Sequence, residues 1–351
     1  MELAPKFVVT IGGVTFENAA LHNKPIKLEI EHRDHEASRL ILTIHDSATD
    51  RAGPFPLFNS TPDPHTTPGI PVKCIAGWDD GTITTVFQGE LVGKKNSYPA
   101  ASKTTFVALH DSHNLRKFAK QDTLPNSAVQ NMLQTKAAEY NCQIQIDPSA
   151  AGDPALTTAM EVIYQIGQSN WQLMLHYLVT YGFISCCGDP NVSGNTIVIK
   201  KDKTNDPKYP FQFGGTEYIS HDIRSEQKRP SRAQQRRGLT HEPPPSGTQS
   251  GTSGTAPAGE QNSQPVSRAS GKTVDGRKGF FARASTNNLA RQLERQGREI
   301  QITLRFQPQM HNEEQIVLSG FGAQIDGTWE TAEVVHSLVG KSETRLVCWQ
   351  A

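Results

Sequence analysis

Two stretches, one near each end of the chain, repeat the same order of strands and turns. Residues 71–111 read as a strand (PVKCIAGW), a turn (DDGT) and two more strands, and residues 315–350 read as a strand (QIVLSGFG), a turn (IDGT) and two more strands. The turns align Asp80-Gly81 with Asp326-Gly327, and Asp-Gly between apolar strands is a strong signal for a type I′ hairpin. A unit this small needs further strands to be stable. The repeat therefore predicts two similar small β-barrel domains.

The first 115 residues read as β-structure throughout. Apolar and polar residues alternate along residues 26–32 and again along 40–44, which is the pattern of half-buried strands. Further strands are predicted at residues 7–11, 14–16, 71–76, 82–94 and 104–110. Residues 50–71 are rich in proline and are predicted to form a long loop.

Residues 116–205 change to an α/β pattern and are predicted to form a middle domain. A helix is expected to begin at Pro125-Asn126-Ser127, followed by a short strand near 144–146 and a second helix over 156–167. Residues 169–201 then predict a helix capped by Ser169 or Asn170 and closed by Gly182, because these residue types suit the two ends of a helix. A hairpin of residues 183–187 and 196–200 is expected to follow it.

The composition changes again between residues 238 and 276, where Gly, Ser, Thr, Pro and Gln dominate. Such a tract cannot bury enough apolar area to order itself, so we predict a flexible insertion. It divides the predicted second β-barrel domain into residues 206–237 and 277–351, with a short helix expected over 285–297. Basic residues that precede the insertion could face a channel, although charge runs are usually solvated: Lys228, Arg229, Arg232, Arg236 and Arg237.

The overall charge and the cysteines restrict the class of protein. Lys plus Arg equals Asp plus Glu at 35 each, so the charge balance gives no support for general binding to a polyanion. Five cysteines without framework spacing argue against a disulfide scaffold and for a reducing compartment. The first residues do not read as a signal peptide, and no apolar run reaches the ~20 residues of a membrane span. We expect synthesis in the cytoplasm and no membrane anchor.

Candidate catalytic residues do not form a recognisable motif. The H-x-x-H pairs His32/His35 and His110/His113 would point to opposite faces of a strand, which suits a shared metal poorly. The chain contains no G-x-S-x-G, P-loop, G-x-G-x-x-G or H-E-x-x-H. Paired carboxylates for glycoside cleavage stay open, but Glu17, Glu90 and Glu330 lie in or beside predicted strands. We predict no enzyme, no cofactor and no metal site.

Two segments together resemble a known family. Residues 169–201 order a capped W-x-L-M-L helix, Tyr-Gly-Phe, a strand, a turn and a strand, and residues 325–346 order Ile-Asp-Gly-Thr-Trp, Val-His and Thr-Arg-Leu. This order resembles the phage late control protein D family, the baseplate hubs of contractile tails, which are similar to the hub part of type VI secretion spike proteins. The resemblance implies an α+β, mostly β fold of two similar barrels separated by an α/β region.

The same resemblance implies a structural role in a virion. The family's hubs are trimers, and two barrels per chain would give six quasi-equivalent barrels that adapt a hexameric tail tube to a trimeric spike. Expected partners are further copies of the chain, the tail tube protein and the spike protein, with tape measure and baseplate wedge proteins as further candidates and DNA passing through the channel. Two alternatives stay open, a baseplate-associated peptidoglycan hydrolase and a carbohydrate-binding module for host attachment.

Overall fold

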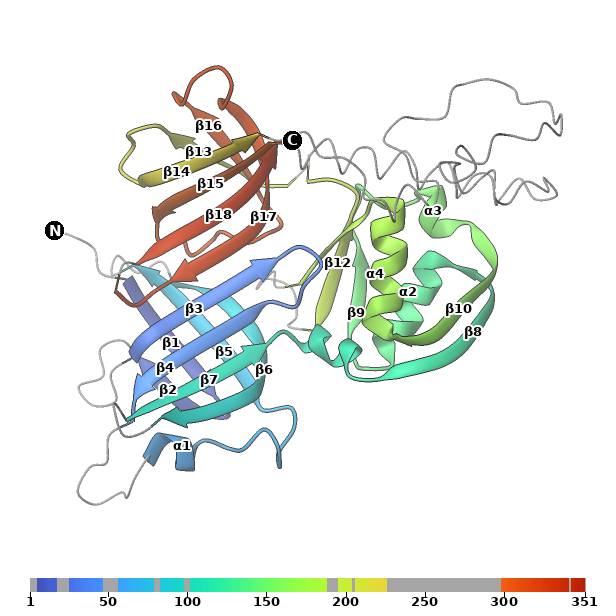
Figure 1. The fold of residues 1–351 in the computed structure, drawn as a ribbon, viewed down its shortest axis with the longest axis horizontal. Helices are drawn as coiled ribbons and strands as arrows, with labels where there is room; N and C mark the ends of the chain where they lie inside the picture. The colour runs from blue at the N-terminus through green and yellow to red at the C-terminus, as the bar shows by residue number, and fades with distance from the viewer. Residues whose placement is uncertain are drawn as a thin grey trace, which may run out of the picture.

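The computed structural model describes residues 5–17, 25–46, 56–78, 83–97, 102–187, 195–203, 206–225, 298–340 and 342–350. The fold is α+β and mostly β, as predicted from the alternating apolar pattern (Figure 1). The expectations for Asp80-Gly81, for the 238–276 insertion, for the helix over 285–297 and for the basic residues 228–237 lie outside the described residues.

The first β region contains the strands expected from the alternation. They are β1 (Pro5–Ile11), β2 (Val14–Glu17), β3 (Pro25–Arg33), β4 (Arg39–His45), β5 (Pro71–Trp78), β6 (Ile83–Ser97) and β7 (Lys103–Leu109). The predicted 50–71 loop also contains a short helix, α1 (Pro56–Ser60). The side chain of Asp46 accepts hydrogen bonds from the amides of Leu57 and Phe58, at 2.9 Å each, and so satisfies the orphan donors of the first turn of α1.

The last β region begins with β13 (Lys208–Gln212) and β14 (Tyr218–Ser225), and continues after the long gap in the described residues. Its other strands are β15 (Arg298–Arg305), β16 (Gln315–Ser319), β17 (Gly327–Ser337) and β18 (Glu343–Gln350).

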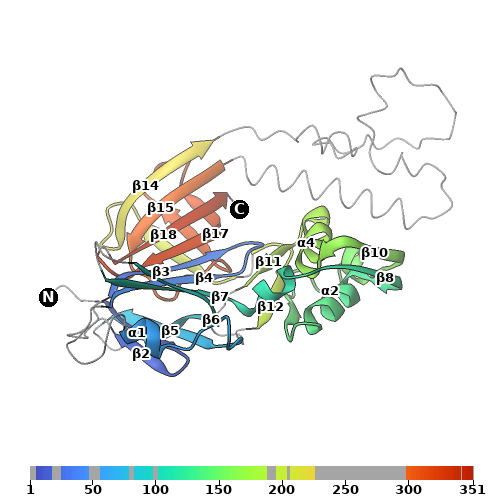
Figure 2. The same ribbon diagram turned by 60° about the horizontal axis from the view of Figure 1, so that its bottom comes forward.

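The two β regions are joined in one sheet. The strand order is β14-β15-β18-β17-β3-β4-β7-β6-β5-β1-β2, with β13 and β16 attached beside β17. The β3–β17 pair connects the first region to the last, and β14 lies at the outer end of the path (Figure 2). Within the described residues, hydrogen bonding does not close either region into a barrel. The sequence predicted two separate barrels, whereas the structure has two regions of one continuous sheet.

The middle region confirms part of the α/β expectation and corrects one helix. It contains the 3-10 helix η1 (Asp111–Arg116), α2 (Val129–Ala138), β9 (Gln143–Ile146), α4 (Asn170–Tyr181), β11 (Ile184–Cys186) and β12 (Thr196–Lys200). The predicted helix over 156–167 is wrong. Only α3 (Pro154–Thr157) is helical there, and β10 (Ala159–Ser169) pairs antiparallel with β8 (Ala119–Ala128).

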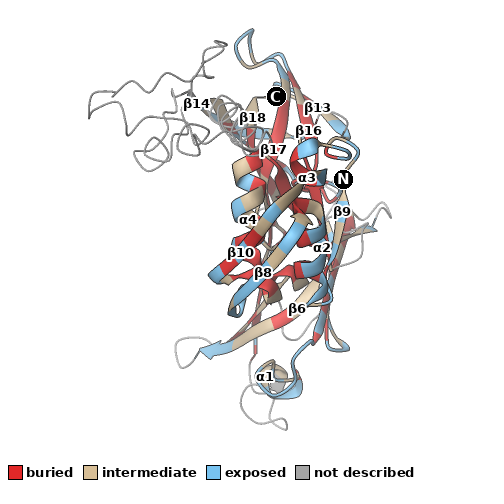
Figure 3. Cartoon of the chain, turned by 90° about the vertical axis from the view of Figure 1, so that its right-hand side faces the viewer, coloured by how far each residue is buried: buried red, intermediate tan, exposed pale blue. Residues whose placement is uncertain are grey.

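The side chains of β10 explain this error. Ile163 and Gln165 are buried, whereas Tyr164 and Ile166 are 59 % and 70 % exposed, so burial alternates with the period of a strand (Figure 3). The apolar residues at 160, 163 and 164 fit a helical spacing as well, and short segments of this kind are ambiguous from periodicity alone.

The helix α4 is specified locally at both ends. The Ser169 hydroxyl accepts a hydrogen bond from the Gln172 amide at 3.2 Å, and the Gln172 side chain accepts one from the Ser169 amide at 2.9 Å. Gly182 closes the helix in the left-handed region at φ 73°. One face, with Trp171, Met174 and Leu178, is buried in the core of the middle region.

One apolar cluster fills the first β region and includes Phe306 and Leu338 of the last region, and two further clusters fill the middle region and the last β region. All five cysteines are buried and free, which agrees with the absence of a disulfide scaffold.

Candidate functional site

The two β regions are built from the same strands in the same order. Strands β3, β4, β5, β6 and β7 of the first region pair as β3–β4, β4–β7, β5–β6 and β6–β7. Strands β14 to β18 of the last region pair as β14–β15, β15–β18, β16–β17 and β17–β18. Each of the strands β3 to β7 thus has a counterpart among β14 to β18, and all of these pairs are antiparallel.

The registers match at the level of single residues. The β6–β7 ladder skips one residue between Leu91 and Gly93, and the β17–β18 ladder skips one between Thr331 and Glu333. Likewise the β3–β4 ladder shifts between Pro25 and Lys27, and the β14–β15 ladder between Tyr218 and Ser220. Because β-bulges occupy specific positions in a fold, their recurrence at equivalent places supports a true internal repeat.

One difference separates the two regions. β1 pairs antiparallel with β5 and continues into β2, whereas β13 takes the equivalent place beside β16 but runs parallel to it. The extra strand β2 runs antiparallel to β1, and so it has the same direction relative to β5 that β13 has relative to β16.

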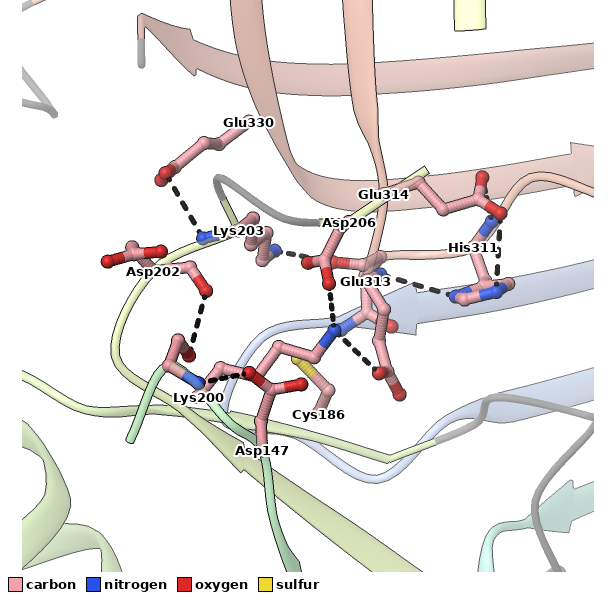
Figure 4. A network of polar contacts seen from close by, with 12 residues as sticks. Asp147, Cys186, Lys200, Asp202, Lys203, Asp206, His311, Glu313, Glu314 and Glu330 are labelled. Carbon is pink, nitrogen blue, oxygen red and sulfur yellow. Dashed lines mark hydrogen bonds and ion pairs between the residues drawn. The ribbon is translucent and has the colours of Figure 1, made fainter. Parts of the chain in front are cut away.

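A buried polar cluster lies where the middle region meets both β regions (Figure 4). The Lys203 ammonium, which follows β12, contacts both carboxylate oxygens of Asp34 at 3.0 and 2.9 Å. It also donates to the carbonyl oxygens of Asn312 and Thr331. The Asn312 side chain donates to Asp34 at 2.9 Å. Lys203 therefore links the end of β3, the β15–β16 connection and β17 through one charge.

Lys200 forms a second ion pair in the same cluster. Its ammonium lies 2.6 Å from Asp206 and 3.1 Å from Glu313, and the side chains of all three residues are largely buried. Nearby, His311 lies 3.3 Å from Glu314. Lys203 and Lys200 each have a carboxylate within contact distance, which is the condition under which charges are tolerated in an interior.

Burial and ion pairing shift the pKa values of these groups in opposite directions. Burial alone lowers the pKa of Lys203, but Asp34 and the other acidic neighbours together outweigh burial, so the pKa is raised above its ordinary value. The same opposition, with Glu313 as the main partner, raises the pKa of Lys200. Burial raises the pKa of Asp206, and its bond to Lys200 reduces that rise. Both lysines therefore stay charged, and the cluster is an electrostatic joint between three parts of the chain.

Two glutamates at equivalent positions of the repeat accept hydrogen bonds from the two segments that connect the β regions to the middle region. Glu90 of β6 and Glu330 of β17 occupy the same place in the repeat, opposite Leu109 and Trp349. Glu90 accepts from the Asn114 side chain at 2.9 Å in η1, where the chain leaves the first region. Glu330 accepts from the Lys203 amide at 3.4 Å, where the chain approaches the last region. Both glutamates thus have structural contacts.

Asp326 and Gly327 lie at the end of a longer connection than the sequence predicts. β16 ends at Ser319 and β17 begins at Gly327, so residues 320–326 form the turn. The Asp326 carboxylate accepts from the Phe321 amide at 2.7 Å and closes this loop. The two-residue type I′ turn is therefore wrong at this site, although Gly327 does have the predicted positive φ, at 137°.

Gly327→Val is expected to destabilise the fold by about 1–3 kcal/mol, because only glycine adopts this backbone conformation readily. A Cβ at Gly327 would meet no atom within 4 Å, so backbone strain is the sole cost. The measurement is the urea midpoint of unfolding, with Thr328→Val in the next strand position as the control. Equal midpoints for the two variants would contradict this explanation.

The imidazole rings of each H-x-x-H pair contact different side chains, although the His113 ring also contacts the His110 carbonyl oxygen at 3.1 Å. His32 contacts Ser38 at 2.8 Å, and His35 contacts Ser185 at 3.1 Å. His110 contacts Ser112 at 3.0 Å, while His113 lies 3.1 Å from Glu90. Among the described residues, no group of three or more His, Cys, Asp or Glu side chains is arranged to hold a metal ion.

The cluster around Lys203 was not expected from the sequence. Lys203 and Asp34 are far apart in the chain, and an isolated lysine after a strand reads as a surface residue. The repeat in the sequence pointed to another pair, because the alignment of Asp80-Gly81 with Asp326-Gly327 puts Glu90 opposite His336, whereas the strand registers make Glu90 equivalent to Glu330. No helix in the described part of the chain has the length and apolar character needed to cross a membrane.

Comparison with solved structures shows which proteins share this fold. The 43 kDa tail protein of prophage MuSo2 from Shewanella oneidensis superposes with a TM-score of 0.63 at 12 % identity, covering 98 % of both chains. A tail protein from Neisseria meningitidis gives 0.59 at 14 % identity, covering 99 % of this chain and 96 % of that one. An E. coli type VI secretion component, described as similar to the T4 tail proteins gp27 and gp5, gives 0.57 at 11 % identity, covering 97 % and 76 %.

The chain therefore has the fold of phage tail proteins over its whole length. More narrowly, the resemblance to late control protein D hubs and to type VI spike hubs is confirmed at the level of the fold. No protein-family model matches the sequence. A search of curated proteins by sequence also gave no match.

Proposed function

We propose that this chain is a structural baseplate hub of a phage or phage-like contractile tail. The observation that carries the proposal is the internal repeat, in which β3–β7 and β14–β18 share strand order, pairing and bulge positions. The whole-length likeness to tail proteins supports the same role. We infer that the protein acts through assembly and not through catalysis.

The repeat suggests how such a hub works. Three copies with two equivalent β regions each present six similar units around one axis, whereas any feature that occurs once per chain is presented three times. A ring of this kind matches a hexameric tail tube on one side and a trimeric spike on the other. We propose domain limits of 1–115, 116–205, 206–237 with 277–351, and the insertion 238–276.

The proposed partners are two further copies of this chain, the tail tube protein and the spike protein. Tape measure and baseplate wedge proteins are further candidates, and DNA would pass through the central channel. In this arrangement the protein is part of the virion baseplate.

The proposal predicts that the purified chain assembles as three copies. Light scattering should give a particle mass three times the 38.5 kDa of one chain for the chain alone, or that mass plus the mass of the bound spike when the spike protein is present. Electron micrographs of the same particles should show rings with near-sixfold features. A monomeric mass in both conditions would overturn the proposal, as would one copy per tail.

A further inference from the structure

The internal repeat leaves one strand edge paired in the last β region and open in the first. In β17, residues Glu333–Ser337 pair with β18 on one side and with β3 on the other. The equivalent residues of β6, Gly93–Ser97, pair with β7 and have no strand on their other edge among the described residues. Accordingly Lys95, Asn96 and Ser97 are exposed, whereas their counterparts Val335 and Ser337 are half-buried and His336 is buried.

The strand equivalent to β3 also has an open edge. β14 corresponds to β3, because each pairs with the strand that follows it and carries a bulge at the same place. Among the described strands β14 has one neighbour, β15, and it ends the sheet path. Leu40 and Ile300 occupy equivalent positions, and they pair with Ile30 and Ile223, respectively. Ile30 therefore corresponds to Ile223, and Glu29 to Asp222.

We propose that β14 of one copy pairs antiparallel with residues 95–97 of β6 in a second copy of this chain. The β3–β17 register within the chain sets the register between chains. Glu29↔Ser337, Ile30↔His336 and Glu31↔Val335 become Asp222↔Ser97, Ile223↔Asn96 and Arg224↔Lys95. This ladder rests on the proposed trimeric hub and names the surface that would join its copies.

The occupant has to be a second copy, because β14 cannot reach β6 of its own chain. Six strands separate them in the sheet path, and they lie on opposite sides of the β structure in both Figure 1 and Figure 2. The ladder is head-to-tail, because it joins the last region of one copy to the first region of the next. In a ring of three copies, the β3–β17 pair within each chain alternates with the β14–β6 pair between neighbouring chains. The third copy pairs with the first, and this closes the ring.

The open edges are chemically suited to this pairing. Unpaired amide and carbonyl groups of an edge strand are a template for another strand. In the proposed register Lys95 lies directly opposite Arg224, a like-charge pair that costs stability, and the Asp222 carboxylate one diagonal step away offsets part of this repulsion. A lysine on an edge can also protect it against pairing.

A disulfide tests the register directly. In the β3–β17 ladder the Leu338 amide donates to Leu28 and the Asp34 amide donates to Ala332, which makes Glu29/Ser337 a non-hydrogen-bonded pair. The equivalent pair, Asp222 and Ser97, would then have Cα atoms ~4.5 Å apart, within the range that a disulfide bridges. Both side chains are exposed, so their replacement leaves the fold intact, and the five natural cysteines are buried.

The test variant is Ser97→Cys/Asp222→Cys in the full chain, oxidised at the concentration where the mass is trimeric. We expect a ladder of linked species on a non-reducing gel that stops at three chains, with more than half of the protein linked. The matched control, Ser97→Cys/Ile223→Cys, places the second thiol on the opposite face of β14 and should link at least fivefold less.

The outcomes distinguish the ladder from the trimer. A trimeric mass with no linking, or with equal linking in the control, overturns the ladder and leaves the proposed hub in place. A monomeric mass at every concentration, with and without the spike protein, overturns both.

Discussion

Lys203→Met is expected to lower the free energy of unfolding by about 3–5 kcal/mol, because it leaves the buried carboxylate of Asp34 without its opposite charge. Lys203 is fully buried, and the Asp34 side chain is 7 % exposed. After the change Asp34 keeps the Asn312 amide at 2.9 Å and the Cys186 thiol at 3.6 Å as donors, but these neutral hydrogen bonds to one carboxylate oxygen do not replace an ammonium that contacts both oxygens. Urea denaturation followed by circular dichroism measures the loss.

Two companion variants identify the cause. Lys203→Met/Asp34→Leu removes both charges and should recover most of the lost stability, since buried pairs can often be replaced by apolar side chains at little net cost. Lys201→Met breaks the partly exposed pair with Asp153 and should cost only about 0–1 kcal/mol. A double variant as unstable as the single one would show that the lost lysine hydrogen bonds, and not the stranded carboxylate, carry the effect.

The position of this ion pair suggests what it is for. Lys203 follows the last strand of the middle region, Asp34 follows β3, and Thr331 lies in β17 beside the β3–β17 joint. The charge thus fixes the angle between the two β regions at the point where the sheet passes from one to the other. In the proposed ring this joint occurs three times, so any error in its angle would prevent closure.

Local patterns predicted much of this fold, for identifiable reasons. Ser169, Gln172 and Gly182 specify α4 through contacts within a few residues of each other, which a sequence displays directly. The alternation along β3 and β4 is similarly local. The repeat was visible because equivalent strands carry equivalent apolar spacing, although the turn at Asp326-Gly327 is longer than the Asp-Gly signal implies.

Long-range pairing was not predictable in the same way. The alternation in β3 and β17 predicts two strands with one buried face each, but it does not say that these strands pair, because any strand edge offers the same hydrogen bonds. The helix predicted over 156–167 was wrong for a related reason, since most of this segment is strand β10, which pairs with β8. Tyr164 and Ile166 are apolar yet exposed, so the positions of the apolar residues in β10 do not match the positions that are buried.

Acidification from pH 6.5 to 4 is expected to destabilise the chain, and His336 should account for about 3 kcal/mol of the loss. Burial lowers the pKa of His336 from 6.5 to about 4, with a further contribution from His311. The Nε2 atom lies 2.8 Å from the Met310 carbonyl oxygen, which can only accept, so Nε2 carries the single proton of the neutral ring. Nδ1, 2.9 Å from the Thr344 hydroxyl, is then the acceptor, and a second proton there would require the hydroxyl to rotate and accept from Nδ1.

The sign of the pH dependence follows from the lowered pKa. Between pH 4 and 6.5 the unfolded chain protonates this histidine and the folded chain does not, so the free energy of unfolding rises with pH across that window. The contribution is complete above pH 6.5 and is lost as the pH falls to the folded pKa. His336→Gln removes the titrating group, so its stability should change with pH by about one proton less than that of the natural chain over this range.

Thr344→Val is the matched control for this measurement. It removes the hydroxyl that contacts His336 and accepts from the Gln307 amide, so it should lower stability at every pH, but it leaves the imidazole in place to titrate. The steep pH dependence should therefore persist in Thr344→Val and weaken in His336→Gln. If His336→Gln keeps the full slope from pH 6.5 to 4, the acid sensitivity belongs to other groups, of which His110 is the next to test because burial lowers its pKa to about 4 as well.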